Sequence, residues 1–331
     1  MALLKPARRA ANAVATIGLR SLSTLVLAEH KDGVLQPNTL HALTAAKQLG
    51  GPVTVLVAGE STTSAAEAAS KADGVAGVLT AQDPCLARSL AEPVAALLQV
   101  VQSNRKYTHV LAPSSTFGRN VLPRAAALLD VQAVADVAEV KDSSTFVRPI
   151  YAGNALATVK VLGEGPRMLT VRPTAFAAAT AQGGNASAQP VSAEELQAAR
   201  DAAGVSEWVA EDVRKSDRPE LGQARVVISG GRALKSAENF HTYLDPLADK
   251  LGAAVGASRA AVDAGYAPND LQAVGISGAI QHVAGMSSSK VIVAINSDAD
   301  APMFQLADYG LVGDLFQILP QLDAELAKLL K

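Results

Sequence analysis

Short apolar runs alternate with longer segments in which apolar residues recur at helical spacing through the first half of the chain. Leu40–Leu49 and Leu86–Gln102 are examples of the longer, helix-like segments. Apolar strands that alternate with helices are typical of a parallel sheet covered on both faces. The apolar runs therefore predict strands of such a sheet at Thr24–Ala28, Val53–Ala58, Gly77–Thr80 and Thr108–Ala112.

Four more apolar runs follow in quick succession, and some of them alternate apolar and polar residues. They predict strands that could form an antiparallel extension of the first domain: Val131–Val140, Thr145–Tyr151, Ala155–Leu162 and Arg167–Arg172. The composition then changes at Ala181–Pro190, where Gly, Ser, Asn and Pro leave little to bury and predict a loop or linker.

A second alternating region begins at Ala224 and ends near the last residue. It predicts strands at Arg225–Ser229, Ala253–Ala257, Leu271–Ile276 and Lys290–Ile295, with helices at Ser236–Leu251, from Ser277, and at Leu311–Leu330, the last kinked or split by Pro320. The fold class is therefore α/β, with two domains that each have a mainly parallel sheet flanked by helices. We expect residues 23–180 to form the first domain, 181–222 a linker and 223–331 the second domain.

Composition supports two globular domains and excludes several functional classes. The chain has 331 residues, of which 49% are hydrophobic, and a size of this order suits about two domains. A net charge of −2 and an aromatic content of 4% argue against a nucleic-acid-binding protein. The single cysteine excludes an internal disulfide, and the five histidines lack the spacing of metal ligands, so no metal site is predicted.

Residues 1–22 contain Lys5, Arg8, Arg9 and Arg20, and the first carboxylate of the chain is Glu29. A start that is basic, free of acids and rich in Ala, Leu and Ser is typical of an organelle transit peptide; a disordered basic tail is the alternative. No apolar run in the sequence approaches the length of a membrane span.

Polar residues follow three predicted strands of the second half, at Ser229–Arg232, Gly256–Arg259 and Gly275–His282. Ligands of open parallel sheets bind beyond the carboxyl ends of the strands. Arginines pair with phosphate, and free amides at a helix start suit a pyrophosphate. A tight turn at the paired glycines and a packed histidine are the alternatives. Neither dinucleotide-binding nor P-loop spacing is present, and no base and acid pair is evident for a serine nucleophile.

The same segments resemble the alpha subunit of electron transfer flavoprotein. The matching text comprises Val226–Arg232, Ala254–Gly265, Ala273–His282, Ile292–Asn296 and Ala307–Gly310. The first half of the chain agrees more loosely but in the expected order. The resemblance implies that the second domain is Rossmann-like and binds FAD.

The resemblance also assigns positions around that cofactor. It implies that Arg232 lies near the FAD phosphates, that Arg259 lies over the flavin ring and that His282 faces the carbonyl edge of the flavin. The full set of implied FAD-binding residues is Arg232, Ser258, Arg259, Ser277, Gly278, Ala279, Ile280, Gln281, His282, Asn296, Asp314 and Leu315. No catalytic residue is implied, because the family consists of electron carriers and not of enzymes with their own substrates.

The expected partner of such a chain is a beta subunit that holds AMP, in a heterodimer. The resemblance implies that the pair accepts electrons from acyl-CoA and other dehydrogenases of the mitochondrial matrix, during fatty acid beta-oxidation and amino-acid catabolism. It then passes them to electron transfer flavoprotein-ubiquinone oxidoreductase in the membrane.

One segment departs from the family pattern. After Gln272 the family continues with a loop that reads Val-Gly-Gln-Thr-Gly-Lys and then a strand, whereas here Ala273 follows at once, so that about fourteen family residues are missing. The Gln and Thr of that loop approach the central ring of the flavin. Leu271–Val274 could slide into the strand position and restore the sheet, since a strand needs only about five residues. Alternatively, the pocket is too open and the chain is a subunit that binds the beta subunit without FAD.

Overall fold

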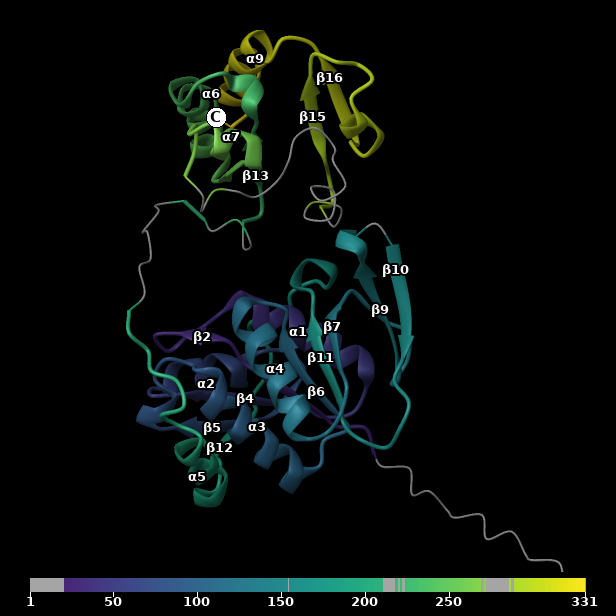
Figure 1. Ribbon diagram of the computed structural model, residues 1–331, viewed down its shortest axis with the longest axis vertical. Coiled ribbons are helices and arrows are strands. Elements are labelled where there is room, and N and C mark those ends of the chain that lie inside the picture. The colour runs from purple at the N-terminus through teal and green to yellow at the C-terminus, as the bar shows by residue number, and fades with distance from the viewer. Residues whose placement is uncertain are drawn as a thin grey trace, which may run out of the picture.

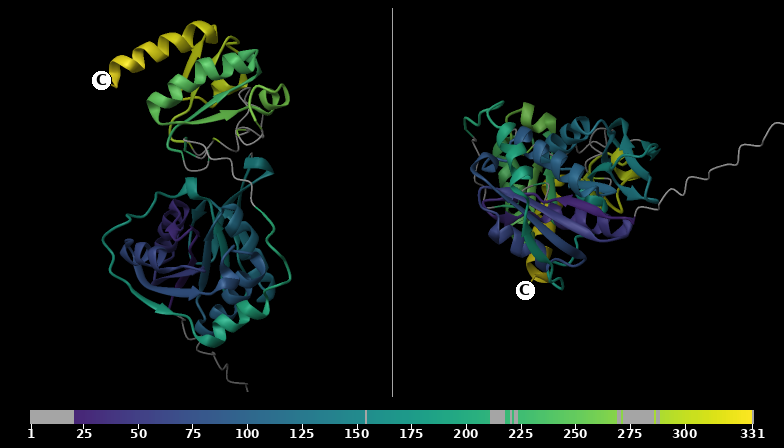
Figure 2. Two further views of the ribbon diagram at one scale, coloured as in Figure 1. Left: turned by 90° about the vertical axis from the view of Figure 1, so that its left-hand side faces the viewer. Right: turned by 90° about the horizontal axis from the view of Figure 1, so that it is seen from below.

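The computed structural model describes residues 21–153, 155–210, 218, 219, 221, 224–268, 271, 286 and 289–330. Figure 1 and the left view of Figure 2 show the described elements gathered in two bodies. The first contains residues 24–201 and the second residues 227–329. Two buried apolar clusters lie in the first body and a third in the second, so each body has its own core.

The first body is built on a seven-stranded sheet in the order β12-β5-β4-β1-β6-β11-β7. Every neighbouring pair in this sheet is parallel. All four residues of β1 are buried, which is the expected environment of a central parallel strand. The strands are β1 (Thr24–Leu27), β4 (Val53–Gly59), β5 (Val75–Gln82), β6 (His109–Pro113), β7 (Ala133–Val137), β11 (Arg167–Val171) and β12 (Ser187–Pro190).

Helices cover both faces of this sheet, as the alternating pattern predicted. Leu25 and Leu27 of β1 point into one cluster and Val26 into the other, because successive side chains of a strand face opposite ways. The first cluster is completed by α3 (Ala91–Arg105), α4 (Thr116–Leu128) and α5 (Ala193–Asp201), and the second by α1 (Pro37–Leu49) and α2 (Thr63–Lys71).

The predicted antiparallel extension is only partly right. An antiparallel sheet forms from β8 (Glu139–Val140), β9 (Thr145–Ile150) and β10 (Ala155–Lys160). A separate short hairpin consists of β2 (His30–Lys31) and β3 (Val34–Leu35). The flanking strands β7 and β11 instead pair in parallel within the main sheet. The β9–β10 hairpin returns the chain so that β11 enters alongside β6, where Met168–Val171 are buried.

The segment predicted to be a linker, residues 181–222, contains a strand and a helix of the first body. β12 pairs with the edge of β5, and all four of its side chains are exposed, so its backbone hydrogen bonds hold it in place. Its terminal Pro190 is tolerated because the strand lies at the sheet edge. The polar composition of this segment is therefore the reason that the sequence did not predict this strand. The helix α5 begins with a capping box between Ser192 and Glu195.

The second body contains two parallel strand pairs and two long helices. Phe240, Leu244 and Leu247 of α6 pack with Val255 of β14 and with Leu319 of α9. Pro320 lies inside α9, which continues through it as one helix. The elements are β13 (Val227–Gly230), α6 (Ala237–Leu251), β14 (Ala254–Ala257), α7 (Arg259–Asp263), β15 (Val293–Asn296), β16 (Tyr309–Val312) and α9 (Leu315–Leu329).

Two predicted elements of this body fall on residues that the structure does not describe. Of the predicted strand Leu271–Ile276, only Leu271 is described, and the predicted helix from Ser277 lies outside the described residues apart from Met286. The described strands pair as β13 with β14 and β15 with β16.

Candidate functional site

The carboxyl ends of β13 and β14 bring three of the predicted site residues to one edge. The two strands are parallel and in register, with Gly230 opposite Ala257. The Ser258 amide donates a hydrogen bond of 3.0 Å to the Gly230 carbonyl, so the segments leaving both strands start side by side. Arg232 begins the short 3-10 helix Arg232–Leu234 after β13, and Arg259 is the first residue of α7. This is the sheet edge at which parallel sheets bind ligands.

Ser258 is built into this edge by its position as a helix cap. It is buried, and its Oγ accepts a hydrogen bond of 3.2 Å from the Ala261 amide at the start of α7. The cap uses an oxygen lone pair and not the hydroxyl hydrogen. Serine at this position therefore does two things, because it ends β14 and orients the first turn of α7.

Arg232 and Arg259 both expose their side chains at this edge. The Nε of Arg259 lies 3.6 Å from a carboxylate oxygen of Asp263, four residues later on α7, and 75% of the Arg259 side chain is exposed. Exposed pairs of this kind contribute little to stability. A phosphate or another anion could therefore take Asp263's place beside the guanidinium at small cost.

Gly230, the last residue of β13, has a different role from the one suggested by the sequence. A Cβ at Gly230 would lie 2.5 Å from Leu244, 2.6 Å from Leu234 and 2.7 Å from Phe240. The hydrophobic core beneath β13 therefore requires this glycine. Packing requires Gly230, which is the last residue of β13, whereas the alternative from the sequence was a tight turn at the paired glycines.

A second group of predicted residues lies where β15 and β16 end. These strands are parallel, with Asn296 opposite Val312, and the Asn296 carbonyl accepts a 2.9 Å hydrogen bond from the Gly313 amide. Asp314 caps α9 through a 2.9 Å bond from the Phe316 amide to Oδ1, and Leu315 is the first residue of that helix. Asn296 and Asp314 are thus neighbours at one sheet edge.

The structure therefore places the six described site residues in two groups, both at carboxyl ends of parallel strands. Arg232, Ser258 and Arg259 form one group, and Asn296, Asp314 and Leu315 the other. The remaining predicted residues, Ser277, Gly278, Ala279, Ile280, Gln281 and His282, lie outside the described residues.

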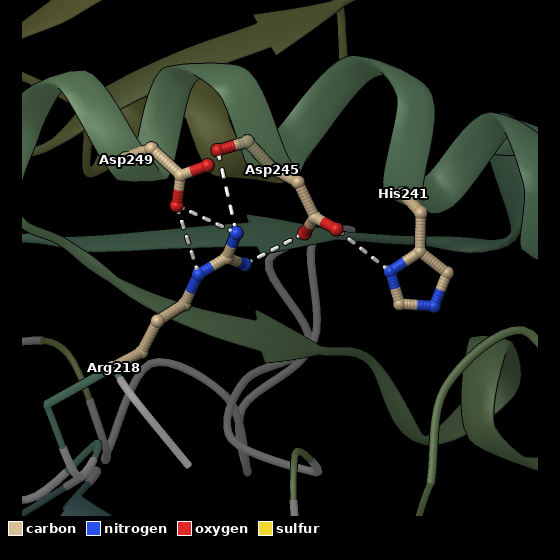
Figure 3. Close-up of polar contacts among 4 residues, drawn as sticks. All are labelled: Arg218, His241, Asp245 and Asp249. Atoms are coloured by element: carbon tan, nitrogen blue, oxygen red, sulfur yellow. Dashed lines mark hydrogen bonds and ion pairs between the residues drawn. The ribbon is translucent and has the colours of Figure 1, made fainter.

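Sequence reasoning missed a polar cluster that runs along α6. Arg218 approaches Asp245 and Asp249 of that helix, and His241 bonds to Asp245 (Figure 3). The signal was available, because two acidic residues four positions apart lie on one face of a helix. In the described part of the chain no helix is long and apolar enough to cross a membrane. The same residues contain no cluster of three potential metal ligands.

Comparison with known proteins identifies the family. Residues 24–202 match the electron transfer flavoprotein domain, and residues 220–273 match the electron transfer flavoprotein FAD-binding domain. The chain belongs to the electron transfer flavoprotein alpha-subunit family. The carboxyl-end groups at Arg232 and Ser258 thus lie within the FAD-binding domain of that family.

Relatives of this family match almost the whole chain. The mitochondrial electron transfer flavoprotein subunit alpha of Arabidopsis thaliana is 49% identical over 92% of this chain and 89% of its own length. The alpha subunit of Pseudomonas aeruginosa is 51% identical over 91% of this chain and 99% of its own. That of Bradyrhizobium diazoefficiens is 54% identical, with coverages of 93% and 99%.

The match to the FAD-binding domain ends at Ala273, one residue after the position at which the resemblance predicts a missing segment. The alignment with the Pseudomonas aeruginosa subunit runs over 316 positions but includes only 91% of the 331 residues of this chain, or about 301. About 15 aligned positions therefore have no residue in this chain, close to the number expected from the family pattern.

Proposed function

We propose that this chain binds FAD at the carboxyl ends of β13–β16 and carries electrons as the alpha subunit of an electron transfer flavoprotein. The observation that carries the proposal is the position of Arg232, Ser258 and Arg259. They meet at one sheet edge inside the segment that matches the FAD-binding domain. The chain is then a redox carrier that acts with other oxidoreductases.

The chemistry of the described residues suits the parts of FAD. In this proposal Arg232 faces the pyrophosphate, since a guanidinium forms strong charge-assisted hydrogen bonds with phosphate oxygens. Ser258 and Arg259 lie toward the flavin. Asn296, Asp314 and Leu315 hold the adenosine end, where amide and carboxylate groups can bond to hydroxyl and amino groups. The loop Ser277–His282 completes the site.

Positive side chains have a specific task at such a site. FAD supplies the one-electron chemistry, while the protein sets its electronics through the charges it places nearby. Arg259 and His282 stabilise the negative charge that accompanies reduction, and they thereby favour uptake of the first electron. This role does not require either residue to form or break a covalent bond.

The partners follow from the same proposal. The chain forms a heterodimer with a beta subunit that holds AMP, accepts electrons from acyl-CoA and other dehydrogenases, and delivers them to electron transfer flavoprotein-ubiquinone oxidoreductase. It works in the mitochondrial matrix, in fatty acid beta-oxidation and amino-acid catabolism, and residues 1–22 serve as its transit peptide. The functional units are a first domain that runs from residue 23 through β12 and α5 to residue 201, a connection that follows it, and an FAD-binding domain over 223–331.

Electron acceptance is the direct test of this function. The chain is produced together with its beta subunit and mixed, without oxygen, with an acyl-CoA dehydrogenase and its acyl-CoA substrate. We expect the flavin absorbance of the carrier to bleach, and a mixture without acyl-CoA to remain yellow. A preparation that contains FAD but stays yellow with substrate would refute the carrier function. A preparation that lacks FAD would indicate the subunit without flavin.

A further inference from the structure

The segment that joins the two bodies, here called the connection, contacts α6 of the second body through ion pairs of Arg218. Arg218 donates from Nη1 to Asp245 at 2.6 Å and from Nη2 to Asp249 at 2.8 Å, with a further bond of 3.2 Å from Nε to Asp249. Nη2 also lies 3.5 Å from the Asp245 carbonyl oxygen. Figure 3 shows the guanidinium directed at both carboxylates on one face of α6. One arginine side chain thus ties the connecting chain to the second body at several points.

The ion pair between Arg218 and Asp245 is less exposed to water than an ordinary surface ion pair. Only 27% of the Arg218 side chain and 32% of the Asp245 side chain are exposed, so water screens the closer pair incompletely. Pro219 follows Arg218 and restricts the backbone dihedral angles of both residues. The backbone therefore loses less conformational entropy when the Arg218 side chain binds to α6. His241 bonds to the other oxygen of Asp245 at 3.0 Å and orients that carboxylate.

The other end of the connection is held on the first body. Trp208 packs beneath Arg88, whose guanidinium carbon lies 4.2 Å from the ring centre. The Ser206 side chain hydrogen-bonds to Glu92 near the start of α3. The chain is therefore fixed to the first body up to Trp208 and to the second body again at Arg218.

The two fixed points limit how far apart the bodies can lie. Any ten-residue stretch, such as the one from Trp208 to Arg218, spans at most about 36 Å when fully extended. Without the Arg218 contacts, the next described residue of the connection with a hydrogen bond to the second body is Val226, whose carbonyl accepts from the Ala254 amide. An eighteen-residue stretch spans at most about 65 Å. Arg218 thus nearly halves the maximum reach of the connection.

We propose that Arg218 is a positioning residue that anchors the connection to Asp245 and Asp249 of α6 and so limits the separation between the two bodies. This contact affects the placement of the second body, and it does not depend on bound FAD. An electron carrier gains from such a limit, because the body that carries the redox group stays within reach of the surface presented by the first body.

Trp208, the one tryptophan of the chain, can serve as the donor for energy-transfer measurements of the distance between the two bodies. A thiol-reactive fluorescent acceptor is attached to Glu238→Cys, an exposed position on α6. The native Cys85 reacts slowly, because burial and the nearby Asp83 raise its thiol pKa to about 11. Time-resolved energy transfer from Trp208 then reports the distribution of distances between the two bodies in the full-length chain.

We expect Arg218→Ala to broaden this distribution and lower the mean transfer efficiency, while Arg225→Ala, which removes an exposed arginine seven residues later, leaves both unchanged. The paired variant Asp245→Asn with Asp249→Asn should change the distribution in the same direction as Arg218→Ala, and combining all three substitutions should give less than the sum of the two effects, because both sets remove the same ion pairs. A distribution in Arg218→Ala equal to that of Arg225→Ala, or full additivity of the two sets of substitutions, would overturn the proposal.

Discussion

At the scale of single residues, the described site depends on where charges stand relative to the ends of strands. Arg232 and Arg259 follow parallel strands and are exposed at the carboxyl ends of those strands. The sequence predicted their positions well, because the residue that follows an apolar strand is readable from pattern alone. It did not predict the pairing of Arg259 with Asp263, since ion pairs within a short helix depend on its exact start.

In the proposed FAD site, Arg259→Ala should weaken FAD binding, because that site places this cation next to the flavin and its developing negative charge. A charged hydrogen bond contributes about 1.5–3 kcal/mol, so FAD should dissociate at least about tenfold faster, with a lower reduction potential. Flavin release on dilution and a spectroscopic redox titration measure these effects. Arg225→Ala is the matched control, because Arg225 precedes β13 and lies toward the opposite sheet edge. Equal behaviour of the two variants would remove Arg259 from the site.

His109 should make the stability of the first body depend on pH. It is buried at the start of β6, where its Nε2 donates a 2.7 Å hydrogen bond to the Ser143 carbonyl. Burial lowers the pKa of His109, an effect opposed by the bond to Ser143 and strengthened by Arg167. The folded state therefore disfavours the protonated form. The stabilisation is complete above the unfolded pKa of about 6.5 and is lost as the pH falls toward the folded value.

Urea denaturation at several pH values checks this expectation. Wild-type protein should lose unfolding free energy below about pH 6.5, at no more than about 1.4 kcal/mol per pH unit from this one proton. His109→Gln should show a shallower dependence than the wild type. An unchanged slope in His109→Gln would show that another group titrates.

At the scale of secondary-structure elements, the apolar pattern predicted the buried strands and several long helices, but it began the last helix at Leu311, where the structure has strand β16 and α9 begins only at Leu315. β1, β4, β6, α1, α3 and α6 lie within a few residues of their predicted positions. The pattern failed for β12, because an exposed edge strand needs only backbone hydrogen bonds and its side chains carry no apolar signal. It also failed for the partners of β7 and β11, since pairing depends on contacts between residues far apart in sequence.

The helix α5, which follows β12, is held by a buried ion pair whose loss should destabilise the first body. Arg105 of α3 donates from Nε and Nη2 to the two carboxylate oxygens of Glu195, at 3.1 and 3.0 Å. Burial tends to raise the pKa of Glu195, but the bonds from Arg105 and Ser192 outweigh it and hold that pKa below its usual value. Only 2% of the Glu195 side chain is exposed.

Arg105→Ala should lower the unfolding free energy by about 2–4 kcal/mol, because a buried carboxylate is left without its counter-charge. Arg124→Ala breaks a longer and more exposed contact of 3.5 Å with Glu92 and should cost at most about 1 kcal/mol. Chemical denaturation of the two variants gives the comparison. Similar losses in both would mean that the Arg105–Glu195 pair does not hold α5 in place.

At the scale of the whole molecule, the two-body α/β architecture was predictable from sequence, and the boundary between the bodies was not. Residues 187–201 join the first body through β12 and α5, and Arg218 already contacts the second. Polar composition marked the whole of 181–222 as one linker because it reports what is not buried in an apolar core. Composition does not reveal a segment that is held in place by backbone hydrogen bonds and ion pairs.

The resemblance implies that about fourteen family residues are missing after Gln272, and in the proposed FAD site their loss should weaken FAD binding in the whole molecule. Inserting the family's loop Val-Gly-Gln-Thr-Gly-Lys and the strand after it between Gln272 and Ala273 should then supply the Gln and Thr that the family pattern places beside the flavin. One regained hydrogen bond of about 0.5–1.5 kcal/mol corresponds to FAD release slowed by about twofold to tenfold. A Gly-Ser insert of equal length controls for chain length. Equal release rates from both insertions would show that the lost loop does not hold the flavin.

The FAD content of the chain purified together with its beta subunit tests the central claim most directly. Visible absorbance after gel filtration, compared with the protein concentration, gives the number of flavins per alpha subunit. Binding at the carboxyl ends of β13–β16 predicts a yellow preparation with close to one FAD per alpha subunit. A colourless complex that remains colourless after incubation with excess FAD would contradict it.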